Sequence, residues 1–559
     1  MTASAVTAGS ASSRSRGPAR LRPDGVGALR VTVWLACAAV VLLPLGAILA
    51  LAAGGSGVAV LWDSDVVEAA GNSLVSATLS GALAVVVGTT FALLLERTDL
   101  PGRGPLRVLA LTPLLVPPFV GAIAWLGIAG PAAPVNVWWR SAFGSPLWSV
   151  YGADGVIVLL TVHSYPIVMI IVTAALRRIP SDLEQAARIA GAGAFRSIVT
   201  ITVPLLRPAL LSSFLLIAVG NLADFGIPSI IGLPEGYVTL ATLVYRYLQS
   251  GTVDDPLAVV ATIGVVLLLV AVAALVIDAF VGGRAREVEA PTTAPQLLPL
   301  GSARAPVGVC MWVLVSGLTV LPLTALLTQT LLVAPGVPMT WENLTLDHLV
   351  TAVTSATAIA GASNSVMLAA LAAVICGVLG VGIGVLVTRT RARTNRALHT
   401  VAMLPQAIPG IVIAVAWLVL APRLGLFNTP WLILAAYVTS FTALVVQAVS
   451  APLSTTSTSV EEAARISGAG RLRALMDISC RMAIPVAISG AVLVAVTAVR
   501  ELTLSVLLLS PGSQTLGVAI FSYQQAGAFS TAAALSFVVA VVGVAAIGVA
   551  VPRAPRAER

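Results

Sequence analysis

The sequence predicts an all-α polytopic membrane protein with about 12 transmembrane helices, arranged as two parallel six-helix repeats. Of its 559 residues, 58% are hydrophobic and only 10% are charged, and the mean hydropathy is +1.00. A soluble protein needs more charge than this to cover its surface. Apolar runs of about 20 residues, long enough to span a bilayer core, recur along the chain. A polar segment at residues 184–191 also recurs, almost unchanged, at residues 461–468.

The apolar runs define the predicted spans, six in each repeat. We expect them at residues 31–53, 73–95, 107–130, 154–176, 208–231 and 257–282, and then at 307–333, 363–388, 398–420, 430–452, 485–509 and 530–552. The first run follows an arginine-rich segment, as a signal peptide does, but its length and the runs after it favour an uncleaved helix. The predicted parts are a basic cytoplasmic tail (1–30), a first repeat (31–283), a linker (284–306), a second repeat (307–552) and a cytoplasmic tail (553–559).

Arginine predicts the orientation of these spans. With the N-terminus inside, the inside segments contain 27 arginines, whereas the outside segments contain only Arg140, Arg246 and Arg423. This asymmetry satisfies the positive-inside rule and predicts a multi-pass protein of the cell membrane with both termini in the cytoplasm. The net charge of +8 follows from the same sorting, so the lipid bilayer, and no nucleic acid, is the expected partner. Because each repeat has an even number of spans, both repeats start on the same side.

The chain contains no lysine. A phosphate-binding P-loop requires one, because its lysine reaches the terminal phosphates of the nucleotide. The four cysteines and three histidines are scattered without the spacing of a disulfide framework or a metal cage. We therefore predict that the chain is not an enzyme and that it holds no cofactor or metal of its own.

The repeated polar segment has the pattern of a capped helix. A serine or threonine precedes Glu184 and Glu461 by three positions, which is the spacing of a capping box. Gly191 and Gly468 follow and permit a sharp turn. The predicted short helices cover residues 182–190 and 459–467. Two such helices on one side of the membrane favour docking of a protein over an interfacial helix that rests on lipid.

The pattern E-A-A-x-x-x-G, followed after nine residues by I-x-L-P, resembles the cytoplasmic signature of ABC importer permeases. The first copy departs from it at Gln185 and Val203, and the second has Cys480 for leucine and Arg481 for proline. Other stretches resemble the fused, two-repeat iron(III)-type branch of that family, and the resemblance covers nearly all of residues 31–552. These stretches are residues 112–125, 222–226, 404–410 and 500–505.

The resemblance implies that two copies of a separate ABC ATPase, which bind ATP and magnesium, dock on the repeated segments. An extracytoplasmic binding protein then delivers the substrate, for which iron(III) is the first expectation and thiamine, phosphonate, polyamine or an oxyanion the alternatives. The docking residues that it implies are Glu184, Gln185, Ala186, Ala187, Arg188, Gly191, Glu461, Glu462, Ala463, Ala464, Arg465 and Gly468.

Ionisable residues inside spans are costly and mark functional sites. Asp224 lies in the fifth predicted span, Glu501 lies 277 positions later in the eleventh, and Arg500 is its neighbour. We expect these three residues to line the translocation pathway, and the alternative is a buried ion pair. A secondary transporter driven by protons or sodium, with the two acids as carriers, is a second candidate function. It has no need of twin docking helices, and nothing in the sequence marks the selectivity filter of a channel.

Overall fold

The computed structural model of the chain describes residues 25–550, apart from residues 56, 250, 252, 254 and 283–296. Within these residues the chain is helical, and its only β pairing consists of two isolated bridges, Thr98 with Leu298 and Leu332 with Leu344. Most of the predicted tails and linker therefore lies outside the described residues.

The first repeat contains twelve α-helices. They are α1 (Gly25–Cys37), α2 (Leu43–Ala53), α3 (Ser64–Arg97), α4 (Arg103–Leu111), α5 (Pro118–Ala129), α6 (Pro134–Phe143), α7 (Ala153–Leu176), α8 (Ser181–Ile189), α9 (Ala194–Ser197), α10 (Val203–Leu222), α11 (Leu240–Gln249) and α12 (Pro256–Gly282). Short π-helical and 3-10 turns join them: η1 (Ala38–Leu42), η2 (Ala59–Trp62), η3 (Thr112–Leu114), η4 (Ile198–Thr202), η5 (Pro228–Gly232) and η6 (Leu233–Glu235).

The second repeat follows the same plan. Its helices are α13 (Arg304–Leu331), α14 (Asp347–Thr354), α15 (Ala356–Arg389), α16 (Asn395–Ala407), α17 (Gly410–Leu424), α18 (Pro430–Thr455), α19 (Ser459–Ile466), α20 (Arg471–Ala474), α21 (Arg481–Val499), α22 (Thr503–Leu507), α23 (Leu516–Gln525) and α24 (Phe529–Ala550). Its short turns are η7 (Gly301–Ala303), η8 (Trp341–Asn343) and η9 (Leu475–Cys480).

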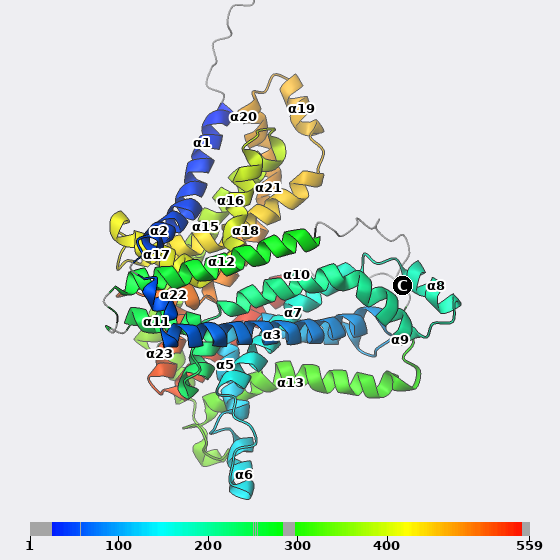
Figure 1. The fold of residues 1–559 in the computed structure, drawn as a ribbon, viewed down its shortest axis with the longest axis vertical. Helices are drawn as coiled ribbons and strands as arrows, with labels where there is room; N and C mark the ends of the chain where they lie inside the picture. Colours follow the sequence, from blue (N-terminus) through cyan, green and yellow to red (C-terminus); the bar gives the residue numbers. More distant parts are fainter. Residues whose placement is uncertain are drawn as a thin grey trace, which may run out of the picture.

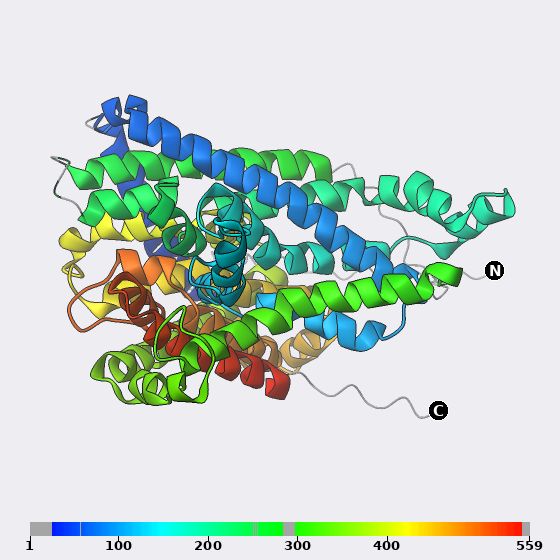
Figure 2. The ribbon, with the colours of Figure 1, turned by 90° about the horizontal axis from the view of Figure 1, so that it is seen from below.

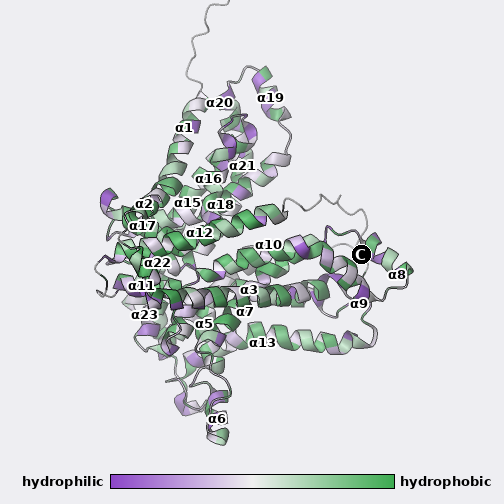
Figure 3. Ribbon diagram, in the orientation of Figure 1, coloured by the Kyte–Doolittle hydropathy of each residue, from purple (hydrophilic) through white to green (hydrophobic). Residues whose placement is uncertain are grey.

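The described residues contain ten helices that are long and apolar enough to cross a membrane, or eleven if the bent pair α16–α17 counts as one span. The twelfth predicted span corresponds to a shorter apolar helix, Phe529–Gly543. All twelve predicted spans coincide with helix, which confirms the polytopic all-α fold. The long helices expose many large apolar side chains, and in Figure 3 they are predominantly hydrophobic along their length. Such surfaces suit contact with lipid.

Four predicted spans are interrupted rather than continuous. Span 107–130 divides into α4, η3 and α5, and span 398–420 divides into α16 and α17, which meet at 107°. Prolines stand at both breaks, where they remove a backbone donor and disfavour helix in the preceding residue. Spans 208–231 and 485–509 end early, at Leu222 and Val499, because a new helical segment starts just beyond Asp224 and Glu501.

The two repeats form bundles that diverge from a common end (Figure 1). The common end holds α11, α22 and α23, and each bundle carries one short helix near its far end, α8 in the first and α19 in the second. Seen from below, the segment around α8 and α9 projects beyond the neighbouring long helices (Figure 2). The short helices therefore lie away from the end where the bundles join.

Each bundle is built on one tightly packed pair of helices, α3 with α7 and α15 with α18. A Cβ atom added at Gly88 would lie 2.7 Å from the Tyr165 carbonyl oxygen, and one at Gly380 would lie 2.5 Å from a methyl group of Val445. Only glycine allows the helices to approach this closely, as small residues do in membrane bundles. Gly88 and Gly380 are equivalent positions, so both repeats use the same contact.

The distance between equivalent positions changes along the repeats. Helices α3 and α15 start and end 292 positions apart, whereas α7 and α18 start 277 positions apart. The difference of 15 residues falls where the first repeat contains α6, which has no counterpart in the second. Helix α6 is therefore an insertion specific to the first repeat. Its buried Asn136 amide fixes it by donating to the carbonyl oxygens of Ala129, Gly130 and Trp148.

The first helix of each repeat packs against the other repeat. Helix α2 lies against α12 of its own repeat and α17 of the second, and α13 lies against α24 of its own repeat and α5 of the first. These contacts are equivalent, so they relate the two bundles by the same pseudo-symmetry as the repeated sequence.

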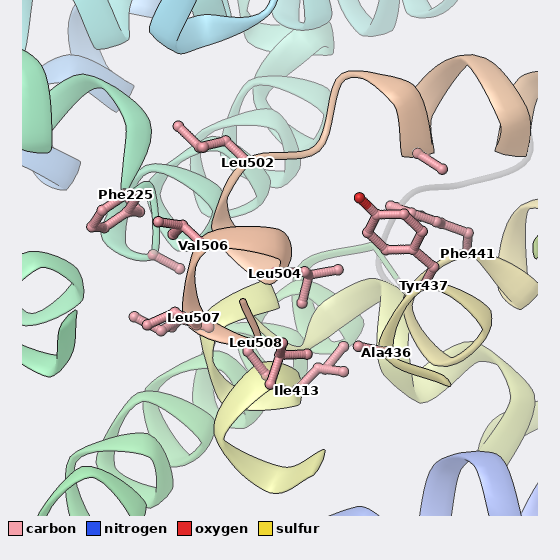
Figure 4. Packing of buried hydrophobic residues seen from close by; sticks show 14 of the residues in the cluster. Phe225, Ile413, Ala436, Tyr437, Phe441, Leu502, Leu504, Val506, Leu507 and Leu508 are labelled. Atoms are coloured by element: carbon pink, nitrogen blue, oxygen red, sulfur yellow. The ribbon is translucent and has the colours of Figure 1, made fainter. Parts of the chain in front are cut away.

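A single large core cluster contains buried residues from both repeats. At the common end, Phe225, Tyr245 and Phe521 stack with ring centroids 5.1 to 5.8 Å apart. Figure 4 shows Phe225 of the first repeat facing Val506 of α22, with Leu504 and Tyr437 behind. This aromatic and aliphatic packing closes the space between the bundles at this end.

Candidate functional site

The repeated polar segments form the predicted short helices, α8 and α19, but not through a capping box. Helix α8 begins at Ser181 with Pro180 as its cap, and α19 has Thr458 as its cap. Neither cap side chain bonds to the backbone of the helix. The Thr458 hydroxyl instead donates to Glu462 at 2.9 Å. The capping box predicted at Thr458 is therefore wrong, because Glu461, which would complete it, points elsewhere.

Glu184 and Glu461 are the buried residues of these helices, only 3% and 8% exposed. Glu184 accepts a hydrogen bond from the Thr202 hydroxyl at 2.5 Å, and Glu461 accepts one from Ser479 at 2.6 Å. Arg97 lies 3.7 Å from Glu184, and Arg389 lies 3.2 Å from Glu461. Since a buried carboxylate is costly without partners, these pairs explain how an acid is tolerated here. Both glutamates, predicted as docking residues, therefore face inward and not towards solvent.

Gly191 and Gly468 end the two helices in the left-handed conformation, with φ of +89° and +95°. The Ala192 amide donates to the Ala187 carbonyl at 2.9 Å, and the Ala469 amide makes the equivalent bond to Ala464. This is the bond of a Schellman turn, which satisfies carbonyls at the end of a helix. The predicted sharp turn after each helix is confirmed.

The outward side of each helix is apolar. Ile189 is 89% exposed and Ile466, 277 positions later, is 88% exposed. Leu183 and Val460, also an equivalent pair, are exposed as well. The other predicted docking residues lie around them: Gln185, Ala186, Arg188, Glu462, Ala463 and Arg465 are exposed, and Ala187 and Ala464 are half-buried. Each helix thus exposes two large apolar side chains, about 120° apart around the helix axis, among polar ones.

Sequence reasoning missed Ile189 and Ile466, although comparison at the 277-residue offset would have found them. The same offset relates Thr202 to Ser479. It does not relate Arg97 to Arg389, which are 292 positions apart because the α6 insertion lies between them and the short helices.

A cavity of about 430 Å³ lies between the repeats. It is lined by α10 and α12 of the first repeat, by the α16–α17 break and by residues just before α22. Asp224 and Glu501 both line it, as does Asp278 of α12, which the sequence reasoning did not single out. One Asp278 carboxylate oxygen is buried without a hydrogen bond. An acid in an apolar span is the signal that would have identified it.

Asp224 and Glu501 occupy equivalent positions with equivalent bonds. The Asp224 carboxylate accepts from the Ile227 amide at 2.9 Å, and Glu501 accepts from the Leu504 amide at 3.1 Å. Each acid thereby caps the helical segment that follows it. The structure brings both into one cavity, as expected of pathway residues.

Arg500 differs from the prediction. Its guanidinium donates to the carbonyl oxygens of Leu114 and Val116, at 2.8 and 3.1 Å, in the break between α4 and α5. It does not line the cavity. Free carbonyls at a helix break are strong acceptors, so they hold the arginine instead of the neighbouring acid. Arg500 ties the second repeat to the first.

Among the described residues, no group of three or more His, Cys, Asp or Glu side chains is placed to hold a metal ion. The three cavity acids are thus spread along the walls and do not form a coordination shell.

The chain resembles several known transport proteins. Over 225 residues it is 29% identical to the putative ferric transport system permease protein FbpB 1 of Haemophilus influenzae, a match that covers 39% of this chain and 34% of that protein. Over 458 residues it is 23% identical to the Fe(3+)-transport system permease protein FbpB 2 of the same organism, covering 80% of this chain and 82% of that protein. A probable molybdenum ABC transporter permease protein of Haloferax volcanii is 30% identical over 220 residues, which are 38% of this chain and 77% of that protein.

A family described as "Binding-protein-dependent transport system inner membrane component" matches residues 84–286 and again residues 377–556. Each match contains one short helix with its terminal glycine and one of the two equivalent cavity acids. Together the matches cover more than half of the chain. The chain therefore belongs to this family of multi-pass inner-membrane ABC permeases, and it carries the family's domain twice.

Proposed function

We propose that the chain is the membrane permease of an ATP-driven iron(III) importer, in which α8 and α19 dock two copies of a separate ATPase. One observation carries the docking: two equivalent helices present equivalent isoleucines, Ile189 and Ile466, almost fully to solvent. Burying one such side chain in a partner is worth about 1.5–3 kcal/mol. A short helix with exposed apolar side chains is an element that can enter a groove on another protein.

The amino-acid composition supports an external source of energy. A chain without lysine lacks the residue that a P-loop uses to hold the terminal phosphates of ATP. Two docking helices in one chain fit two ATPase subunits. The arginine distribution supports a cytoplasmic position for both helices and both chain termini. An extracytoplasmic binding protein then meets the opposite end, where α11, α22 and α23 lie.

The lining of the cavity supports a cation as cargo. Asp224, Glu501 and Asp278 line it, whereas no arginine does. A passage with acidic walls attracts cations and repels oxyanions such as molybdate or phosphonate. The relatives named for ferric transport agree with this reading. We therefore favour iron(III) over the oxyanion alternatives.

The same cavity supports a switching mechanism. Aromatic packing of Phe225, Tyr245 and Phe521 closes one end, and the cavity runs from Asp224 along α10 towards the end that carries α8. This arrangement fits a state open to the side of the ATPases. When the ATPase pair closes, the two bundles turn as rigid bodies and the path opens to the other side.

Photocrosslinking tests the docking. A benzophenone amino acid is placed at Ile189 or Ile466 in the intact chain, expressed with the ATPase and binding protein that copurify with it. Illumination should join each site to the ATPase. The same probe at Val86, an exposed position in the middle of α3, serves as the control. Crosslinking at Val86 alone, or at none of the sites, would overturn the docking.

Transport by the reconstituted complex tests the driving force and the cargo. Proteoliposomes are supplied with the binding protein and with radioactive iron(III) citrate or molybdate, with ATP inside or with an imposed proton or sodium gradient. ATP-dependent iron uptake is expected, and Asp224→Asn with Glu501→Gln should reduce it. Gradient-driven uptake without the ATPase would establish the secondary transporter instead. Uptake of molybdate in preference to iron would refute the assignment of the cargo.

A further inference from the structure

We infer that Arg97 and Arg389 are positioning residues, each of which locks a docking helix to three spans of its own bundle through a buried arginine–glutamate–hydroxyl junction. The inference rests on the proposed docking of an ATPase at α8 and α19. It adds a specific device for transmitting the movement of the ATPase to the membrane helices.

The junction in the first repeat joins four elements. Arg97 is the last residue of α3 and is completely buried. Its guanidinium lies 3.7 Å from Glu184 of α8 and donates to the Leu176 carbonyl at 2.9 Å, at the end of α7. Glu184 in turn accepts from Thr202 of η4, which leads directly into α10. One ion pair thus connects α8 to α3, α7 and α10.

The second repeat contains the same junction at equivalent positions. Arg389 is the last residue of α15, and its side chain is 2% exposed. It lies 3.2 Å from Glu461 of α19 and donates to the Thr456 carbonyl at 3.0 Å, just after α18. Glu461 accepts from Ser479 of η9, which leads into α21. Thr456 is equivalent to Ile179, to whose carbonyl Arg97 also donates at 3.4 Å. The ion pair, the hydroxyl bond and this carbonyl bond therefore recur in the diverged repeat, which indicates a common task rather than chance packing.

The docking helices bury an acid rather than apolar side chains. Among the side chains that the structure describes, Glu184 is the only buried one on α8, and Glu461 is the only buried one on α19. A surface helix normally buries an apolar stripe against its own protein. Here large apolar side chains face outward, and an acid faces inward. Each helix is therefore joined to its bundle through a buried charged pair.

A charged pair suits this task better than apolar packing. Apolar contacts are non-directional and let a short helix slide. Here hydrogen bonds hold each arginine to a carbonyl and each glutamate to a hydroxyl, and charge attraction joins the two. Loss of either residue of the pair is destabilising, because the remaining residue becomes a buried charge without compensation. In the described part of the chain, Arg97 Nη1 and Arg389 Nε, the buried nitrogens that face the glutamates, make no hydrogen bond, so the charge of the glutamate is what compensates them.

The test measures coupling, not only assembly. Arg97→Met and Arg389→Met remove the charge with little change in length, and Arg473→Met removes one from the exposed pair Arg473–Asp477 in the same region. ATP hydrolysis and iron uptake are measured in proteoliposomes. For Arg97→Met and Arg389→Met, uptake per ATP should fall by roughly tenfold or more, since misplacing a positioning group by about 1 Å can cost up to about 100-fold in rate. For Arg473→Met it should not change.

A second variant separates positioning from folding. Arg389→Met combined with Glu461→Gln leaves no buried charge, so thermal stability and ATPase binding should recover relative to Arg389→Met. Uptake per ATP should stay low in this double variant. Recovery of uptake together with stability, or wild-type coupling in the single variants, would overturn the inference. If the wild-type helices fail to crosslink to the ATPase, the proposed docking itself falls, which is a distinct result.

Discussion

Replacing Gly191 with alanine should loosen the end of α8, and the structure gives the magnitude. Gly191 has φ of +89°, a conformation that costs an L-residue about 1–2 kcal/mol. A Cβ added there meets no atom within 4 Å, so steric contacts contribute nothing to this cost. Gly193, two residues later, is equally open but has no left-handed φ. Gly193→Ala is therefore a control that differs only in backbone conformation.

Hydrogen exchange of the chain in lipid nanodiscs measures the effect. A cost of about 1–2 kcal/mol corresponds to roughly a 5–30-fold shift in the local opening equilibrium. The amides of Gly191 and Ala192, which bond to Arg188 and Ala187, should exchange faster by that factor in Gly191→Ala. Gly191→Asn should lie between alanine and wild type, because asparagine tolerates this conformation. Equal exchange in the Gly191→Ala and Gly193→Ala variants would refute the reasoning.

Three further predictions concern packing and docking. Ile189→Ala and Ile466→Ala should each weaken binding of the ATPase roughly 10–100-fold, the equivalent of about 1.5–3 kcal/mol of lost burial, in a binding titration; equal affinity would contradict it. Phe521→Ala should cost about 3–5 kcal/mol of stability and lower the thermal midpoint in differential scanning fluorimetry, whereas Trp341→Ala, at an exposed site, should change it little. Asn136→Ala should free α6 to proteases, at a cost of about 1–3 kcal/mol for carbonyls left without a donor, and unchanged cleavage would count against that role.

Much of the fold was predictable because a membrane span is recognised from the amino-acid composition of about 20 consecutive residues. The lengths of the apolar runs were sufficient to locate every span, and Gly191 and Gly468 predicted the turns after α8 and α19. The breaks at Leu222 and Val499 were not predicted, since an apolar run gives no sign that Asp224 or Glu501 will cap a new segment. Hydropathy describes the free energy of transferring side chains into lipid, and it takes no account of hydrogen bonds between a carboxylate and backbone amides.

The site was predictable only where it depends on residues that are close together in the sequence. The docking helices and their equivalence followed from one repeated motif. The inward direction of Glu184 did not, because the capping-box rule considers only four consecutive residues, whereas its real partners, Arg97 and Thr202, lie 87 and 18 positions away. Arg500 was misassigned for the same reason: its acceptors at Leu114 and Val116 belong to the other repeat.

Because the first helix of each repeat packs against the other repeat, the two repeats should assemble without a covalent link between them. Because α2 lies against α17 and α13 lies against α5, each half completes the other, and the peptide connection between them is not what holds them together. Two polypeptides cut within residues 283–296 should therefore find each other and assemble when made together. Either half made alone would expose to lipid the surface that normally packs against the first helix of the other half: α17 would lack α2, and α5 would lack α13. Joining the two repeats in one polypeptide then ensures that the two unlike halves are made in equal number.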